Sequence, residues 1–183
     1  MVNPEDLNQF LASVEKRAYS MAMVSVKNAD DALDIVQDAM FTLVKKYRHK
    51  PGNEWAPLFY RVLNNRLLDF HRARSRRARI FSWLPFTEGQ DEDEMAQFAG
   101  SPGDNPAFRQ ELDASTACLL EALAELPARQ QQAFMLRAWE GMDVKDTARS
   151  MNCSPGSVKT HYSRAVHTLR EKLPDDLQDF KDG

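Results

Sequence analysis

Apolar residues recur at intervals of three and four positions over long stretches at both ends of the chain, and the alternating runs typical of strands are nearly absent. This spacing predicts amphipathic helices rather than a sheet. We therefore expect an all-α protein of two small helical domains, over residues 1–80 and 113–183, joined by a flexible acidic linker over residues 81–112.

The clearest helix of the first domain is predicted over residues 30–47. Its apolar stripe, which we expect to face the core, consists of Leu33, Val36, Met40, Val44 and Tyr47. The opposite face carries two acids, an amide and an aromatic ring: Asp34, Gln37, Asp38 and Phe41. An aromatic ring among acids indicates either ordinary surface or a docking site for a basic partner helix.

Charge is distributed unevenly along the chain. Residues 61–79 hold seven arginines and one aspartate, whereas residues 80–113 hold eight acids and one arginine. The net charge of −3 for the whole chain therefore conceals a basic segment followed directly by an acidic one. The acidic segment also contains three of the nine prolines and three of the seven glycines, which favours a linker. This linker is expected either to mask the arginines in the free protein or to be a solvated tether.

A second helix is predicted from about Pro57 into the arginine cluster, and it combines arginines with aromatic rings. This combination suits unpaired DNA, because arginines neutralise phosphates and aromatic rings stack on bases taken out of the duplex. The candidate residues for binding unpaired DNA are Trp55, Tyr60, Arg61, Asn65 and Arg72. Aromatic residues at helical spacing are usually core, so Trp55 and Tyr60 are as readily assigned to the interior as to a base.

A helix-turn-helix is predicted near the C-terminus, with helices over residues 144–151 and from Pro155, and a turn over residues 152–154. The core-facing stripe of its last helix is expected to be Val158, Tyr162, Ala165 and Leu169. The opposite side holds donors and cations without an acid: Lys159, Thr160, Ser163, Arg164 and His167. Such a face suits the major groove, where Arg or Lys bonds guanine and Thr or Ser meets phosphate or a thymine methyl.

Other chemistry is sparse. Cys118 and Cys153 cannot form a disulfide framework, and neither the cysteines nor the four histidines have the spacing of a zinc site or a catalytic centre. No segment is long and apolar enough to span a membrane, and the N-terminus does not read as a secretory signal. We expect a cytoplasmic protein that is not an enzyme, needs no cofactor and does not insert into a membrane.

The chain strongly resembles the extracytoplasmic-function (ECF) sigma factors of bacterial RNA polymerase over nearly its whole length. Three motifs stand in the family's order, the last of them after the linker: DALDIVQDAMFTLVKKY, WAPLFYRVLNNRLLDFHRARSRR and LPARQQQAFMLRAWEGMDVKDTARSMNCSPGSVKTHYSRAVHTLREKL. A lone helix-turn-helix fits an autonomous regulator of duplex DNA equally well. Such a regulator, however, needs neither the acidic face nor the aromatic and arginine-rich helix.

The resemblance implies a division of labour among three surfaces. The clamp helices of the polymerase's largest subunit would bind Asp34, Gln37, Asp38 and Phe41. The promoter's minus 10 element would be recognised and its opened strand trapped by Trp55, Tyr60, Arg61, Asn65 and Arg72. The minus 35 duplex would be read by Lys159, Thr160, Ser163 and Arg164. The implied partners are core RNA polymerase, promoter DNA and an anti-sigma factor, with membrane anchoring of the latter left open.

Overall fold

The computed structural model describes residues 4–81 and 114–174, and within these ranges it contains helices and no strand. The elements are α1 (Pro4–Val26), α2 (Ala29–Tyr47), α3 (Gly52–Phe81), α5 (Ala114–Ala124), α6 (Ala128–Phe134), the π-helix η2 (Met135–Trp139), α7 (Val144–Met151) and α8 (Pro155–Lys172). The all-α prediction is confirmed. The predicted linker, apart from residue 81, lies outside the described residues, as does its expected masking of the arginines.

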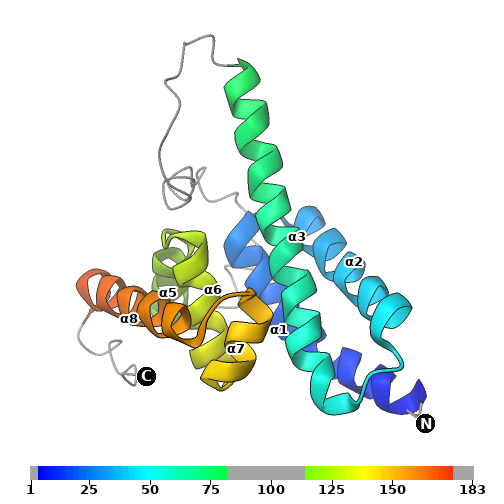
Figure 1. Cartoon of the computed structure of the whole chain (residues 1–183). Coiled ribbons are helices and arrows are strands. Elements are labelled where there is room, and N and C mark those ends of the chain that lie inside the picture. Colours follow the sequence, from blue (N-terminus) through cyan, green and yellow to red (C-terminus); the bar gives the residue numbers. More distant parts are fainter. Residues whose placement is uncertain (1–3, 82–113, 175–183) are drawn as a thin grey trace.

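The N-terminal domain (residues 4–81) is a bundle of the three helices α1, α2 and α3. One side of α3 contacts α2, and another side contacts α7 of the C-terminal domain (Figure 1). The periodicity did not predict α1, although its buried residues line much of the core. An aromatic cluster joins α1 to the start of α3: the Phe10 ring lies 5.8 Å from that of Trp55 and 6.2 Å from that of Phe59. The helix α3 begins at Gly52, five positions before the predicted start at Pro57.

The helix α2 starts where capping and charge favour a start. Asn28 is the N-cap, and its side-chain oxygen accepts a hydrogen bond from the Asp31 backbone N–H at 3.0 Å. Acids in the first turn and lysines in the last complement the helix dipole. The buried face consists of Ala32, Val36, Ala39 and Leu43.

The predicted stripe of α2 was therefore partly wrong. Leu33 and Val44 are 46% and 36% exposed, whereas two of the four buried positions are taken by alanines. Small side chains let α1 and α3 pack closely against α2, and the larger apolar residues fall beside the contact. A pattern that weighs residues by hydrophobicity alone does not register this preference for small volume.

The C-terminal domain (residues 114–174) contains the predicted helix-turn-helix with the predicted boundaries. Asp143 caps the start of α7 by accepting a hydrogen bond from the Asp146 N–H at 2.7 Å. The C-cap of α7 is Asn152, whose φ of 52° is left-handed. Ser154 caps α8 by accepting from the Ser157 N–H at 3.0 Å, and Pro155 follows at the start of the helix. Short polar side chains thus set both ends of the turn.

The two domains share one hydrophobic core. The buried apolar residues form a single cluster that runs from α1 to α8. In the described residues, none of the helices has the length and apolar character that a membrane crossing requires.

Candidate nucleic-acid interface

The helix α8 presents its polar face to solvent. The predicted core stripe is buried, with Tyr162 stacked on Phe134 at 6.0 Å between ring centroids. The opposite residues are all exposed: Lys159, Thr160, Ser163, Arg164 and His167. Lys159 and Arg164 make no ion pair within the described ranges, so both cations are available to an anion.

Two details modify this face. The Thr160 hydroxyl donates to the Gly156 carbonyl at 3.1 Å, which leaves its methyl group and its lone pairs for a ligand. The face also ends at an acid, because Glu171 lies 3.4 Å from the His167 ring. The cationic part of the face is therefore the first half of α8, around Lys159 and Arg164.

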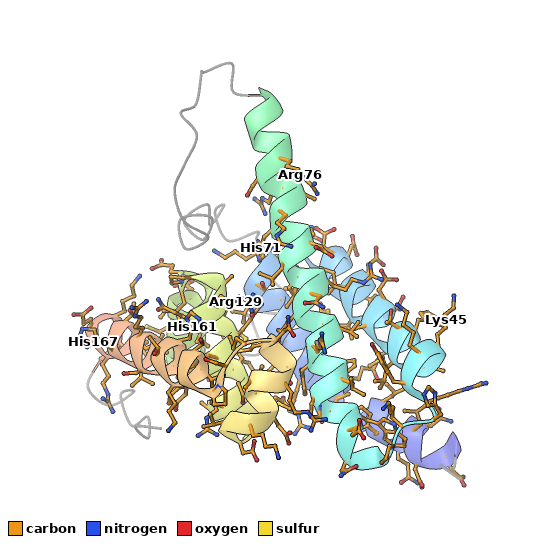
Figure 2. All side chains as sticks on the ribbon, in the orientation of Figure 1. Lys45, His71, Arg76, Arg129, His161 and His167 are labelled. Carbon is orange, nitrogen blue, oxygen red and sulfur yellow. The ribbon has the colours of Figure 1, made fainter. Side chains whose placement is uncertain are left out.

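The helix α3 exposes three of its five predicted DNA contacts. Arg61, Asn65 and Arg72 are exposed, and Arg72 lies 3.7 Å from Asp69 in a solvated ion pair. The C-terminal half of α3 extends beyond the other helices, and Arg76 lies on this part (Figure 2). His71 joins α3 to α1 just before this extension, since the His71 Nε2 lies 2.9 Å from the Ser25 hydroxyl of α1. Burial, and secondarily the charge of Arg74, lowers the pKa of His71.

The structure places Trp55 and Tyr60 in the interior, the alternative that the sequence had left open beside a contact with bases. The two side chains are 3% and 1% exposed, respectively. Trp55 packs in the aromatic cluster with Phe10, and its ring also lies over Gly52 in the first turn of α3. Large aromatic surfaces gain more from burial than from exposure, so the rings follow the packing of the bundle.

Tyr60 lies at the contact between the two domains. Arg17 of α1 and Glu140, which follows η2, flank its hydroxyl, and the Arg17 Nε lies 3.1 Å from the Glu140 Oε1. Burial raises the pKa of Tyr60, and the Glu140 carboxylate raises it further against the opposing effect of Arg17. The hydroxyl therefore stays protonated and remains a hydrogen-bond donor.

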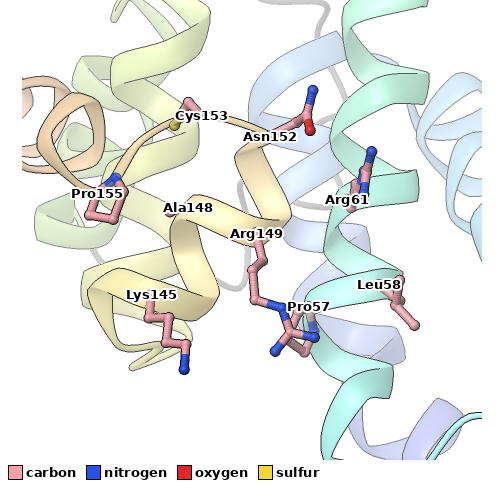
Figure 3. A pocket seen from close by; sticks show the side chains of 9 residues that line it. All are labelled: Pro57, Leu58, Arg61, Lys145, Ala148, Arg149, Asn152, Cys153 and Pro155. Atoms are coloured by element: carbon pink, nitrogen blue, oxygen red, sulfur yellow. The ribbon is translucent and has the colours of Figure 1, made fainter.

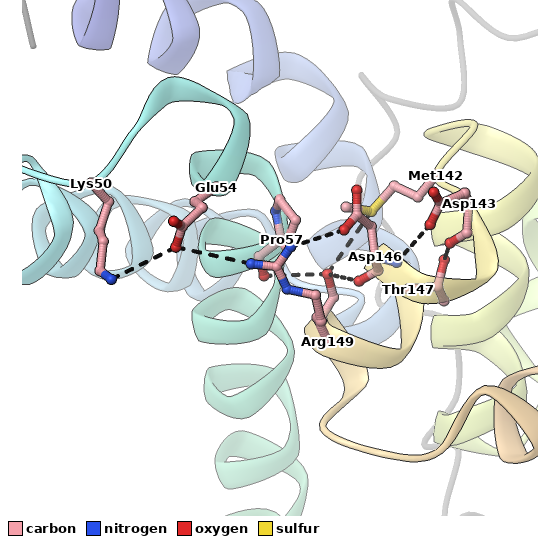
Figure 4. Close-up of polar contacts among 9 residues, drawn as sticks. Lys50, Glu54, Pro57, Met142, Asp143, Asp146, Thr147 and Arg149 are labelled. Carbon is pink, nitrogen blue, oxygen red and sulfur yellow. Dashed lines mark hydrogen bonds and ion pairs between the residues drawn. The ribbon is translucent and has the colours of Figure 1, made fainter.

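The first helix of the helix-turn-helix packs directly on α3. The Ser150 hydroxyl donates to the Pro57 carbonyl at 3.2 Å, and Arg149 lies 3.9 Å from Glu54, which also pairs with Lys50 at 3.7 Å (Figure 4). Sequence reasoning did not predict this contact, because nothing in a residue pattern relates a carbonyl on one helix to a hydroxyl 93 positions later.

A pocket of about 540 Å³ opens beside this contact (Figure 3). Its polar lining includes Arg61 from α3 and Lys145 and Arg149 from α7, and no acid lines it. Arg61 and Lys145 form no ion pair with any described residue. The pocket therefore concentrates positive charge between the two domains.

The exposed face of α2 combines acids with apolar side chains. The predicted residues Asp34, Gln37, Asp38 and Phe41 are all exposed, and Asp38 lies 3.8 Å from Arg66 of α3. Phe41 is 73% exposed and shares this face with the exposed parts of Leu33 and Val44, which sequence reasoning had assigned to the core. An apolar strip edged by acids is a feature of protein interfaces rather than of ordinary surface.

A helix-turn-helix with a cationic face, an arginine-bearing helix and an acid-edged apolar strip together define a helical transcription factor that binds DNA and a protein partner. Family models for Sigma-70 region 2 and Sigma-70 region 4 match residues 8–77 and 116–169. The chain belongs to the ECF sigma factors, and it directs RNA polymerase in the initiation of transcription. The alternative of an autonomous regulator is not favoured.

Individual relatives agree with this membership. The RNA polymerase sigma factor SigV of Bacillus subtilis is 30% identical over 159 residues, which are 85% of this chain and 83% of SigV. The RNA polymerase sigma-E factor of Streptomyces coelicolor is 28% identical over 144 residues, covering 78% of this chain and 72% of that protein. The ECF sigma factor BldN of the same organism is 45% identical over 64 residues, only 35% of this chain and 24% of BldN.

The fold is also similar to that of a solved sigma factor. The structure of RpoE from Bartonella quintana, determined in complex with the anti-sigma factor NepR, has a TM-score of 0.68 and 26% sequence identity. The match covers 94% of this chain and 99% of RpoE. The similarity therefore includes both domains rather than one of them.

Proposed function

We propose that the two domains, over residues 1–80 and 113–183, divide the work of a sigma factor and that residues 81–112 connect them. The exposed face of α2 binds core RNA polymerase through Asp34, Gln37, Asp38 and Phe41. Leu33 and Val44 extend this contact, since their exposed parts lie along the same face. The observation that carries the assignment is the 73% exposure of Phe41 among acids.

The helix α3 binds the minus 10 element of the promoter through Arg61, Asn65 and Arg72. The exposure of these three side chains supports this role, and the burial of Trp55 removes that residue from the set. The helix α8 binds the minus 35 element through Lys159, Thr160, Ser163 and Arg164. Support comes from the exposure of all four and from the core stripe opposite them.

The protein acts in the cytoplasm, where RNA polymerase and promoters are, and catalyses no reaction of its own. An anti-sigma factor is its regulator, since the structurally similar RpoE was solved in complex with one.

The test is reconstitution with core RNA polymerase from the same bacterium, followed by sequencing of the transcripts made on genomic DNA. We expect initiation at a small set of promoters that share minus 10 and minus 35 sequences. Initiation at the same sites without the chain would contradict the proposal.

The variant Asp38→Lys tests the polymerase contact in a direct binding assay. We expect it to weaken polymerase binding by about tenfold, because it reverses a charge at the edge of the docking face while leaving α8 intact. The matched control is Glu15→Lys, the same charge change at an exposed position of α1. Equal polymerase affinity for the two variants, measured by fluorescence anisotropy of labelled sigma factor, would remove α2 from the interface.

A further inference from the structure

The C-terminal domain covers one side of α1 and α3 through polar contacts at three points. Ser150 bonds the Pro57 carbonyl, Arg149 pairs with Glu54 at 3.9 Å, and Glu140 pairs with Arg17 at 3.1 Å. The proposed minus 10 helix is thus in direct contact with the domain proposed to read the minus 35 element.

Glu140 is the most buried charge of this contact. Its side chain is 4% exposed, whereas that of its partner Arg17 is 49% exposed. A buried carboxylate is costly unless its partners satisfy it, and here they do so only in part. Neither the Arg17 pair nor the neighbouring Tyr60 hydroxyl forms a well-aligned hydrogen bond with the Glu140 Oε1.

The donors around this carboxylate are those that bind phosphate elsewhere in proteins. A guanidinium binds carboxylate and phosphate oxygens with the same geometry, and a phenol hydroxyl is a frequent donor to DNA phosphates. The buried Tyr60 hydroxyl lies beside the Glu140 carboxylate without forming a well-aligned hydrogen bond within the described residues. Arg17 and Tyr60 therefore form an anion site that Glu140 fills imperfectly.

The surroundings of this contact also favour a polyanion. Arg61 from one domain and Lys145 and Arg149 from the other line a common pocket without an acid (Figure 3). Like charges that face one another across an interface oppose the contact. Glu54 offsets part of this repulsion by pairing with Arg149, and Glu140 pairs with Arg17 elsewhere in the same contact.

The dimensions of a promoter require this contact to open. Elements centred near positions −10 and −35 are about 25 base pairs apart, which is about 85 Å at 3.4 Å per base pair. A packed chain of this length is only about 40 Å across. The closed arrangement leaves the α2 face on the far side of α3 from α7 (Figure 1), so polymerase has access to its docking face before the domains separate.

We propose that Arg17, Tyr60 and Arg61 form a binding surface for the DNA backbone that the C-terminal domain masks, and that Glu140 is the latch, its carboxylate standing where a DNA phosphate binds after opening. This inference rests on the proposed function, because it assumes that α3 binds promoter DNA. It returns Tyr60 to the DNA-binding surface, but only in the open form and through its hydroxyl.

The test compares the full-length protein with Glu140→Gln and with Glu15→Gln. Glu15 is the matched control, since it carries the same charge at an exposed position of α1. The readouts are the radius of gyration from small-angle X-ray scattering and the affinity for a fluorescein-labelled, random-sequence, single-stranded DNA of 20 nucleotides. We expect Glu140→Gln to increase the radius and to raise the affinity about tenfold, because a closed population lowers the apparent affinity in proportion. Glu15→Gln should change neither.

Arg17→Gln separates the latch from the phosphate site. This variant should increase the radius without the gain in affinity, and adding it to Glu140→Gln should abolish the gain. Arg17 is half exposed on α1, so this variant also tests the latch if Glu140→Gln does not fold. An unchanged radius in Arg17→Gln or Glu140→Gln would overturn the latch, and a gain that survives in the double variant would overturn the phosphate site.

Failure of this inference is distinguishable from failure of the proposed function. Specific transcription starts by the wild-type protein with polymerase, together with an unchanged Glu140→Gln, would overturn the latch alone. Opening and tighter DNA binding by Glu140→Gln, together with no specific starts, would overturn the proposed function on which the promoter argument depends.

Discussion

The helices α3 and α8 both combine cationic and aromatic side chains, but they differ in how many of their predicted DNA contacts are exposed. In α8, Tyr162 lies on the core stripe and the cations lie opposite, so every predicted contact is exposed. In α3, Arg61, Asn65 and Arg72 are exposed, whereas Trp55 and Tyr60 are core residues. Charged side chains followed the sequence-based expectation in both helices, and aromatic side chains followed the packing.

The difference lies in which domains cover each helix. The helix α8 packs on α5, α6 and α7 of its own domain and leaves the opposite face exposed. The helix α3 contacts α1, α2 and α7, so its first half is enclosed from several sides (Figure 1). A helix enclosed in this way has little surface on which a large ring remains exposed, whatever its sequence resembles.

Of the replacements considered for α3 and α8, that of Trp55 should have the largest effect, and the effect is on the free energy of unfolding. Trp55→Ala removes a 3%-exposed ring from the aromatic cluster and should lower the free energy of unfolding by about 3–5 kcal/mol. The control Phe41→Ala removes a 73%-exposed ring and should change it by less than about 0.5 kcal/mol. Urea denaturation followed by circular dichroism measures both. Unaltered stability in Trp55→Ala would reassign this ring to a functional surface.

Replacing Arg164 should affect DNA binding and leave stability unchanged. Arg164→Ala should cost about 1–3 kcal/mol at a specific minus 35 sequence if the guanidinium meets a base edge. Arg170→Ala, on the same helix but partly buried, is the control for loss of an arginine elsewhere on α8. Anisotropy titrations with promoter and scrambled duplexes distinguish two roles. An equal loss on both duplexes would assign Arg164 to the phosphate backbone.

The fold was largely predictable from local signals. The turn of the helix-turn-helix follows from Ser154 and Pro155, which cap and start α8, and from the helical spacing on each side. The start of α3 was missed because Pro57 lies inside the helix and is also a common first residue. The buried face of α2 was misassigned in part because two of its four buried residues, Ala32 and Ala39, are small.

The candidate sites were predictable only where one helix carries the whole site. The faces of α2 and α8 follow from periodicity alone, and all eight predicted residues on them are exposed. The contact of Arg17 with Glu140 depends on how two domains pack across a long connection, and helical periodicity contains no information on that distance. Tyr60 lies at this contact between domains, which is why its sequence context did not decide between burial and exposure.

Two histidines extend the comparison of α3 with α8 to pH. His71 of α3 is partly buried with a lowered pKa, whereas the His167 side chain of α8 is 76% exposed. Because the folded state disfavours protonated His71, the unfolded chain binds more protons below its ordinary pKa of about 6.5. The contribution of His71 to stability is therefore present at neutral pH and is lost as the pH falls through the range below about 6.5.

The replacement His71→Gln should flatten this dependence, and it is the smallest of the three expected effects. One group changes the free energy of unfolding by at most about 1.4 kcal/mol over one pH unit. Urea midpoints of the wild-type protein should fall between pH 7 and pH 5.5 by more than those of His71→Gln. His167→Gln is the control for replacing a histidine at an exposed position. If the urea midpoint of His71→Gln depended on pH as strongly as that of the wild-type protein, burial of His71 would not be the cause of the dependence. The enclosed part of α3 would then end before His71.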